Sequence, residues 1–217
     1  MGLEKKQALA EFHRTQILTA AGKLFSKQGF DKTKMDEIAK AADYSKATLY
    51  VYFKSKDDII NHLTHQSMTM LYTYVHETLL DITDFFACYK KLCYALVKYQ
   101  AEYPLYFDIA LSPINIDLDN PETPPIFKSI YETGEAINSE VKLFLIRGIE
   151  LNYIKSDLPI LPTIFWLWGS LAGIIKINAQ KNVYIAQDIN LHENEFLDYS
   201  FKLLLNSILK EGVVNAY

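Results

Sequence analysis

Residues 43–59, DYSKATLYVYFKSKDDI, combine aromatic rings with positive charge. The rings and cations lie close together along the segment: Tyr44, Lys46, Tyr50, Tyr52, Phe53, Lys54 and Lys56. Lysines neutralise phosphates and release counterions. Tyrosine offers a hydroxyl to a phosphate and a flat ring to a sugar or a thymine methyl. This composition favours a surface that contacts a nucleic-acid groove, although a tyrosine-rich amphipathic helix taken alone is more often part of a core.

Other reactive arrangements receive little support from spacing. His62 and His65 stand three residues apart, which suits a metal ion on a helix, but no third ligand follows at regular spacing. No Cys-His or Ser-His-Asp arrangement and no glycine-rich phosphate loop can be argued. We therefore expect no enzyme activity, no metal and no cofactor.

The composition indicates a helical protein with a basic N-terminal part. The 217 residues are 50% apolar and 22% charged, with only 8 Gly and 7 Pro, which favours helices over many short strands. The net charge is −4. Residues 1–60 hold ten Lys and one Arg against eight acidic residues, a net charge of +3, and the rest of the chain carries −7. A basic module on an acidic body is a meaningful asymmetry.

Short helices are predicted in the basic part. An apolar stripe predicts a first helix that ends at Gly29, where Phe30 can pack on Phe25. Thr33 and Asp36 have the spacing of a capping box that starts a second helix, which ends near residue 42.

A third helix is predicted from Ser45 to Phe53, with Leu49 and Phe53 facing inward. A second capping box, Ser55 and Asp58, opens a long fourth helix that runs to about residue 80. Two short helices joined by a tight turn, the second rich in Lys, Thr and Tyr, fit a helix-turn-helix.

The remaining chain is also helical by pattern, with helices predicted over 84–102, 104–111, 125–153, 159–181 and 193–211. Residues 158–175 contain no charge and reach the lower length limit of a membrane span. Pro159 and Pro162 shorten the helical part, so we expect a buried helix and no membrane. Cys88 and Cys93 point in different directions on one helix and indicate reduced thiols, and the start lacks a signal peptide, which together predict a cytoplasmic protein.

The chain resembles the TetR family of bacterial transcriptional regulators from Arg14 to Leu63. The resemblance rests on the run AA..LF...GF..T....IA..A and on S..TLY.YF.SK, which the chain carries within ILTAAGKLFSKQGFDKTKMDEIAKAADYSKATLYVYFKSKDDI. It implies an all-α fold, with a three-helix DNA-binding head over residues 1–55 and a helical ligand-binding and dimerisation body over 56–217. The expected partners are a double-stranded DNA operator, a small-molecule effector and a second copy of the chain.

Residue by residue, the resemblance places DNA contacts on the start of the second helix, on the third helix and on the start of the fourth. These are Thr33, Lys34, Ser45, Lys46, Ala47, Thr48, Tyr50, Tyr52 and Lys56. Two positions depart from the family pattern, since Asp43 and Ala47 stand where glycine is common. Asp tolerates the left-handed conformation of the turn, and Ala47 adds a methyl group toward the groove. A degenerate head that no longer binds DNA is the alternative.

Aromatic residues in the body indicate a pocket for a small apolar or aromatic effector. They lie on the elements that surround the cavity in the TetR family, and ordinary core packing is the alternative for each: Tyr99, Tyr103, Phe107, Tyr131, Phe144, Trp166 and Trp168.

The last two helices are too apolar for the surface of a monomer. We expect them to form a dimer seam through Gly169, Gly173, Leu197, Phe201, Leu204, Leu205 and Ile208. For the two glycines a close contact within one chain is an equally good interpretation. Effector binding would shift the fourth helix, and with it the spacing of the two DNA-reading helices, so that repression is relieved.

Overall fold

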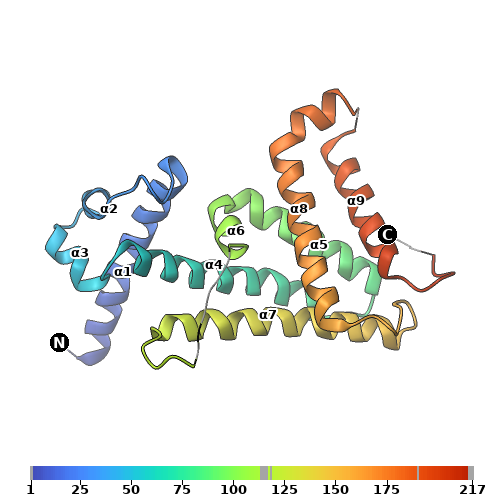
Figure 1. The fold of residues 1–217 in the computed structure, drawn as a ribbon, viewed down its shortest axis with the longest axis horizontal. Coiled ribbons are helices and arrows are strands. Elements are labelled where there is room, and N and C mark those ends of the chain that lie inside the picture. The colour runs from blue at the N-terminus through green and yellow to red at the C-terminus, as the bar shows by residue number, and fades with distance from the viewer. Residues whose placement is uncertain (1, 113–116, 118, 190, 215–217) are drawn as a thin grey trace. The chain divides into compact units, whose positions relative to one another are not determined.

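The computed structural model describes residues 2–112, 117, 119–189 and 191–214. The helices are α1 (Leu3–Gln28), α2 (Met35–Ala41), α3 (Lys46–Tyr52), α4 (Lys56–Leu79), α5 (Phe85–Glu102), α6 (Pro104–Ala110), α7 (Pro125–Glu150), α8 (Ile160–Gln187) and α9 (Glu193–Ile208) (Figure 1). Within the described residues the only strand-like pairing is an isolated bridge between Ile154 and Leu209. The predicted all-α class is confirmed.

The chain divides into two compact units. The first comprises Met1–Met68 and Asp108–Ile130, and the second comprises Thr69–Phe107 and Tyr131–Tyr217. The division falls inside α4, whereas the sequence pattern predicted a boundary before it. The reason is that α4 is one continuous helix with residues in both units.

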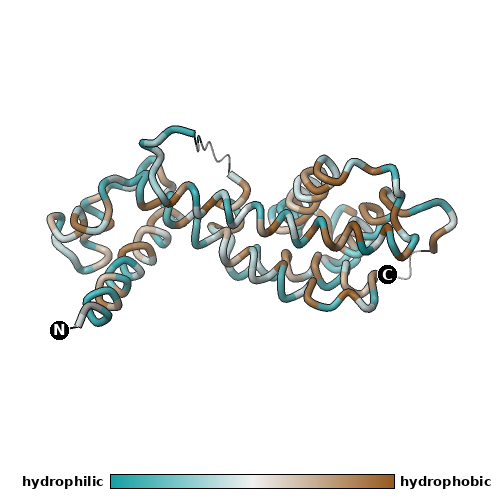
Figure 2. Tube along the Cα trace, turned by 90° about the horizontal axis from the view of Figure 1, so that it is seen from below, coloured by the Kyte–Doolittle hydropathy of each residue, from teal (hydrophilic) through white to brown (hydrophobic). Residues whose placement is uncertain are grey.

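In the first unit, α1, α2 and α3 pack on one another (Figure 1). α1 ends as predicted at Gly29, whose φ of 86° is left-handed and whose N–H donates to the Phe25 carbonyl at 2.9 Å. The rings of Phe25 and Phe30 lie 5.3 Å apart. The start of α1 is largely hydrophilic (Figure 2).

The predicted capping box of Thr33 and Asp36 is wrong. The residue that precedes α2 is Lys34, whose backbone N–H donates to Glu37 Oε2 at 2.8 Å. Thr33 is instead turned inward, and its hydroxyl donates to the Gly29 carbonyl at 2.8 Å. The predicted pair, Thr33 and Asp36, and the observed pair, Lys34 and Glu37, differ by one position in the sequence. The side-chain types alone did not distinguish between them.

The turn between α2 and α3 is a Schellman motif. The N–H of Asp43 donates to the Lys40 carbonyl at 3.2 Å, and the N–H of Tyr44 donates to the Ala39 carbonyl at 2.9 Å. Asp43 occupies the left-handed position with φ 61°. Ser45 then caps α3 as predicted, its Oγ accepting the Thr48 N–H at 3.0 Å.

The second unit is built around α8, which packs against α5 and α9. α8 kinks at Lys181 (φ −120°, ψ 15°), where the helix was predicted to end. Residues 182–187, which lie between the helices predicted over 159–181 and 193–211, continue as helix, so the predicted end of the first of these helices is wrong. After α9, the Lys210 N–H donates to the Tyr153 carbonyl and the Lys155 N–H to the Ile208 carbonyl.

α8 is also the one helix in the described part of the chain that is long and apolar enough to cross a membrane. Its most apolar window has a mean hydropathy of 1.6, and 28% of that window is buried inside the protein. Much of an apolar helix is therefore uncovered in the single chain.

The Schellman motif predicts an unusual response to substitution at Asp43. Asp43→Gly is expected to stabilise the protein by up to about 1 kcal/mol, because glycine adopts the left-handed conformation without a steric penalty. Asp43→Val is expected to destabilise it by at least about 1–2 kcal/mol. Urea denaturation of both variants checks this, and an Asp43→Val protein as stable as the native one would contradict it.

Candidate nucleic-acid interface

α3 presents one face to solvent and buries the other. The predicted inward anchors Leu49 and Phe53 are both buried. Tyr50 and Val51 are exposed, and Val51 is the most exposed of the apolar side chains on α3, with 75% of its surface accessible. The sequence analysis missed Val51 as a candidate contact. Its spacing could have found it, because a residue two positions from each anchor lies on the opposite side of a helix.

Lys46 is held at the surface by a residue of α2. Its Nζ lies 2.8 Å from Asp36 Oδ1, and both side chains are more than half exposed. The hydrogen bond and the charge of Asp36 raise the pKa of Lys46, so the ammonium stays charged at neutral pH. An exposed pair of this kind is weak. A DNA phosphate can therefore replace Asp36 as the partner of Lys46.

The other predicted contacts on the head divide into accessible and inaccessible side chains. Lys34, Ser45 and Ala47 are exposed, and the hydroxyls of Ser45 and Thr48 are hydrogen-bonded to each other at 2.8 Å. Thr33 is only 1% exposed and its hydroxyl is bonded to Gly29. The prediction that the Thr33 side chain contacts DNA is therefore corrected, because its surface is buried.

Lys56 also has a different place from the one predicted. Its Nζ donates to the carbonyls of Phe30 at 2.7 Å, Asp31 at 3.3 Å and Thr33 at 3.1 Å. The ammonium also lies 4.2 Å from the centre of the Phe30 ring. An ammonium has three donors, and all three are engaged. The side chain of Lys56 thus ties the first turn of α4 to the loop between α1 and α2, and it has no donor left for a phosphate.

We predict that Lys56→Met destabilises the protein by about 1–2 kcal/mol, because three carbonyls, two of them in part-buried hydrogen bonds, lose a charged donor. Lys54→Met is the matched control, since Lys54 is exposed and only its backbone N–H is recorded in a hydrogen bond, to Asp58. Chemical denaturation of both variants measures the difference. Equal stability of the two variants would argue against a stabilising role of the hydrogen bonds made by the Lys56 ammonium.

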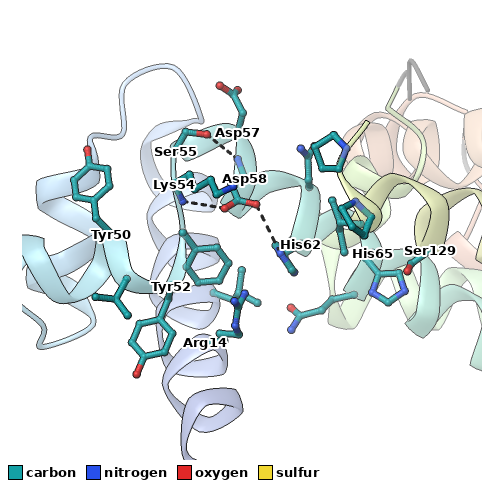
Figure 3. A pocket seen from close by; sticks show the side chains of 18 of the residues that line it. Arg14, Tyr50, Tyr52, Lys54, Ser55, Asp57, Asp58, His62, His65 and Ser129 are labelled. Carbon is teal, nitrogen blue, oxygen red and sulfur yellow. Dashed lines mark hydrogen bonds and ion pairs between the residues drawn. The ribbon is translucent and has the colours of Figure 1, made fainter. Parts of the chain in front are cut away.

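The head also contains a cleft of about 970 Å³ beside α3 (Figure 3). Asp58 lines this cleft. Its N–H donates to Ser55 Oγ at 3.1 Å, which is one of the two hydrogen bonds of the predicted second capping box. Its carboxylate accepts the N–H of Lys54 at 2.9 Å, where the capping box would have the N–H of Ser55. His62 Nε2 lies 3.7 Å from Asp58, and burial lowers the pKa of His62. Across the described residues, no group of three or more His, Cys, Asp or Glu side chains could hold a metal ion.

The seven predicted effector-contacting residues of the body are not gathered around one cavity. Phe144 and Trp168 line a small apolar cavity of about 10 Å³, roughly the room for one water molecule. Tyr99 and Phe107 are buried in an aromatic cluster, and their rings lie 6.0 Å apart. Exposed side chains make up the rest: Tyr103, Tyr131 and Trp166. Beside Phe144 and Trp168, this cavity leaves too little room for an effector.

The predicted dimer seam is corrected at its leucine-rich part. The side chains that were expected to face a partner are 6% exposed or less and form the core of the protomer: Leu197, Phe201, Leu204, Leu205 and Ile208. The reason is that α9 uses this face to pack against α8.

A different apolar surface remains uncovered, which we call the α8–α9 stripe. On α8 it repeats every fourth residue, with Gly173 part-exposed and the others exposed: Leu161, Phe165, Gly169, Gly173 and Ile177. The exposed Tyr199 and Leu203 of α9 are counted with it. A Cβ atom built on Gly169 or Gly173 meets no atom within 4 Å. The two glycines therefore do not serve close packing within the chain, which was one of the two interpretations of their spacing.

Residues 17–63, which include all of α2 and α3, match the family described as bacterial regulatory proteins, tetR family. Residues 17–63 thus have the DNA-binding domain of the TetR family. The regulator HbdR of Aromatoleum sp. (strain CIB) is 40% identical over 93 residues, 43% of this chain and 39% of HbdR. The negative regulator of the biofilm operon icaADBC of Staphylococcus aureus, IcaR, is 27% identical over 60% of this chain and 68% of IcaR. The chain thus spans less than half of the first of these relatives.

Solved structures of TetR-type regulators share the fold over nearly the whole chain. A putative tetR family regulator from Shewanella sp. PV-4 has a TM-score of 0.69 at 17% identity and covers 92% of this chain and 99% of its own. FadR from Bacillus subtilis, solved with stearoyl-CoA, has a TM-score of 0.66 at 18% identity and covers 89% and 98%. At these identities the likeness establishes the fold of both units.

Proposed function

We propose that this TetR-family chain is a cytoplasmic regulator of transcription that binds a near-palindromic DNA operator as a homodimer and is released by a small apolar or aromatic effector. The observation that carries the proposal is α3 itself. It is capped by Ser45, it is anchored by two buried side chains, and its exposed face holds Lys46, Tyr50 and Val51. The ammonium can contact a phosphate, the tyrosine hydroxyl can form a hydrogen bond, and the valine methyl groups can contact a thymine methyl in the major groove.

Repression is the favoured direction of control. IcaR, the similar protein from Staphylococcus aureus, is described as a negative regulator. A dimer places two recognition helices roughly 34–36 Å apart, one turn of DNA, so the operator is expected to be a near-palindrome with half-sites at that spacing.

The ion pair between Lys46 and Asp36 allows a test in which two substitutions are expected to change operator affinity in opposite directions. Lys46→Ala is expected to weaken operator binding and to reduce the slope of log K against log salt by about 1, because one phosphate contact is lost. Asp36→Asn is expected to strengthen binding, since Lys46 is freed and a negative charge is removed. Fluorescence anisotropy at several salt concentrations measures both, and two variants shifted in the same direction would contradict the assignment.

The α8–α9 stripe supports the proposed homodimer. A stripe repeated every fourth residue is suited to ridges-into-grooves packing of helices, and the bare surface at Gly169 and Gly173 allows two backbones to approach closely. A second copy of the chain would cover apolar side chains on α8 and α9 that are otherwise left in water.

We predict that Phe165→Glu converts the dimer into a monomer, because a buried, unpaired carboxylate would face the partner. Leu143→Glu is the matched control, since Leu143 is 59% exposed and Phe165 60%, but Leu143 lies on α7, outside the stripe. Analytical ultracentrifugation separates the outcomes. A native protein that sediments as a monomer, or a Phe165→Glu protein that remains dimeric, would rule out this seam.

The effector proposal rests on the small apolar cavity beside Phe144 and Trp168. Two proteins that share this fold were solved with apolar or aromatic compounds: FadR with stearoyl-CoA and SmeT with triclosan. The cavity here is lined by apolar and aromatic side chains of α5, α7, α8 and α9. An effector must widen it, and it shifts the protein between states only through its different affinity for them. Because α4 holds residues of both units, a shift of α4 can pass from the body to the head.

A sensor whose head has lost DNA affinity is the competing function, since Asp43 and Ala47 replace common glycines. The structure shows Asp43 in the left-handed conformation that the turn needs, which favours an intact head. Selection of genomic fragments by the purified protein at a fixed, moderate salt concentration tests the choice. An enriched palindrome supports the regulator, and no enrichment with or without candidate effectors supports the sensor.

A further inference from the structure

A pair of side chains outside the predicted contacts joins α1 to the turn before α3. His13 Nδ1 lies 2.5 Å from the hydroxyl oxygen of Tyr44. The two rings meet edge to face, with centroids 5.4 Å apart. The His13 ring also lies 5.6 Å from the ring of Tyr52, near the end of α3. One imidazole thus contacts the residue before the cap of α3 and the last residue of α3.

Tyr44 has a special position in the helix-turn-helix. Its backbone N–H is fixed by the Ala39 carbonyl, and it directly precedes Ser45, the residue that caps α3. The start of a recognition helix is the part that enters the major groove, and the backbone phosphates line the rim of that groove. With its backbone fixed by the turn, the side chain of Tyr44 takes its direction from the hydrogen bond to His13.

We propose that Tyr44 is a further phosphate contact and that His13 is the positioning residue that orients the Tyr44 hydroxyl; this inference rests on the proposed DNA-binding function. A phenol has one proton to donate. When Nδ1 of His13 carries no hydrogen, it accepts that proton, and none is left for a phosphate. When Nδ1 carries a hydrogen, it donates to the Tyr44 oxygen, and the hydroxyl proton can be donated to a phosphate oxygen.

The phosphate-bound arrangement therefore needs a hydrogen on Nδ1 of His13, and that nitrogen must donate to the Tyr44 oxygen. The edge-to-face packing of the two rings and the contact of the His13 ring with Tyr52 hold the imidazole in this place.

The experiment compares the native protein with His13→Phe, Tyr44→Phe and the double variant. Both substitutions keep a ring and remove only the hydrogen bond. Operator affinity is measured by anisotropy at one pH and one salt concentration, with the fragment enriched by genomic selection. Each single variant is expected to bind about three- to tenfold more weakly than the native protein. The double variant is expected to be no weaker than the weaker single variant, because both remove the same interaction.

Two further variants separate positioning from folding. His62→Phe removes another histidine of the first unit, whose ring lies 5.3 Å from Phe53, and should keep the native affinity for the operator. His13→Asn retains a hydrogen-bonding side chain near the position of Nδ1. It should recover most of the affinity that His13→Phe loses. Thermal denaturation checks that every variant is folded, and His13→Asn serves as the test if His13→Phe does not fold.

The outcomes are distinguishable. A native protein that enriches no DNA contradicts the proposed function and, with it, this inference. If the native protein binds its operator but His13→Phe and Tyr44→Phe bind equally well, the function stands and the inference fails. Strictly additive losses in the double variant would also overturn it, because the two side chains would then act independently.

Discussion

The placement of α3 depends on the burial of Leu49 and Phe53, and the proposed DNA contacts on α3 depend on that placement. Two anchors one helical turn apart fix the rotation of the helix about its axis. Once they are buried, Tyr50 and Val51, which lie between them in sequence, face solvent. The Schellman turn at Asp43 and the cap at Ser45 then fix where the helix begins. Rotation and starting point together determine which atoms reach a groove.

The features that sequence predicted well are those governed by neighbours along the chain. The stop at Gly29 with Phe25 and Phe30, the cap at Ser45 and the anchors of α3 follow from local spacing, and all are confirmed. The family match added the helix-turn-helix, because its motifs extend over the same short segment.

The features that sequence did not predict depend on residues far apart in the chain. Lys56 was expected to contact phosphate, yet its ammonium is bonded to carbonyls 23 to 26 positions earlier. The leucines of α9 are apolar enough for a seam, but whether α8 or a partner covers them is decided by packing. The sequence around His13 did not mark it as a functional residue, because its hydrogen-bond partner, Tyr44, lies 31 positions further along the chain. Spacing rules describe one element, and these contacts join two.

The closed cavity beside Phe144 and Trp168 has a kinetic consequence. If only a small fraction of molecules is open at a given moment, the apparent Kd of an effector is its intrinsic Kd divided by that fraction. The rate of binding then stops rising at high effector concentration, where it equals the rate at which α5, α7, α8 and α9 separate enough to admit the compound. Substitutions that shorten Trp168 or Leu171 would enlarge the open fraction without adding any contact to the effector. If the proposed effector binds in this cavity, the sensitivity of the protein is therefore set as much by the packing of α5, α7, α8 and α9 as by the compound.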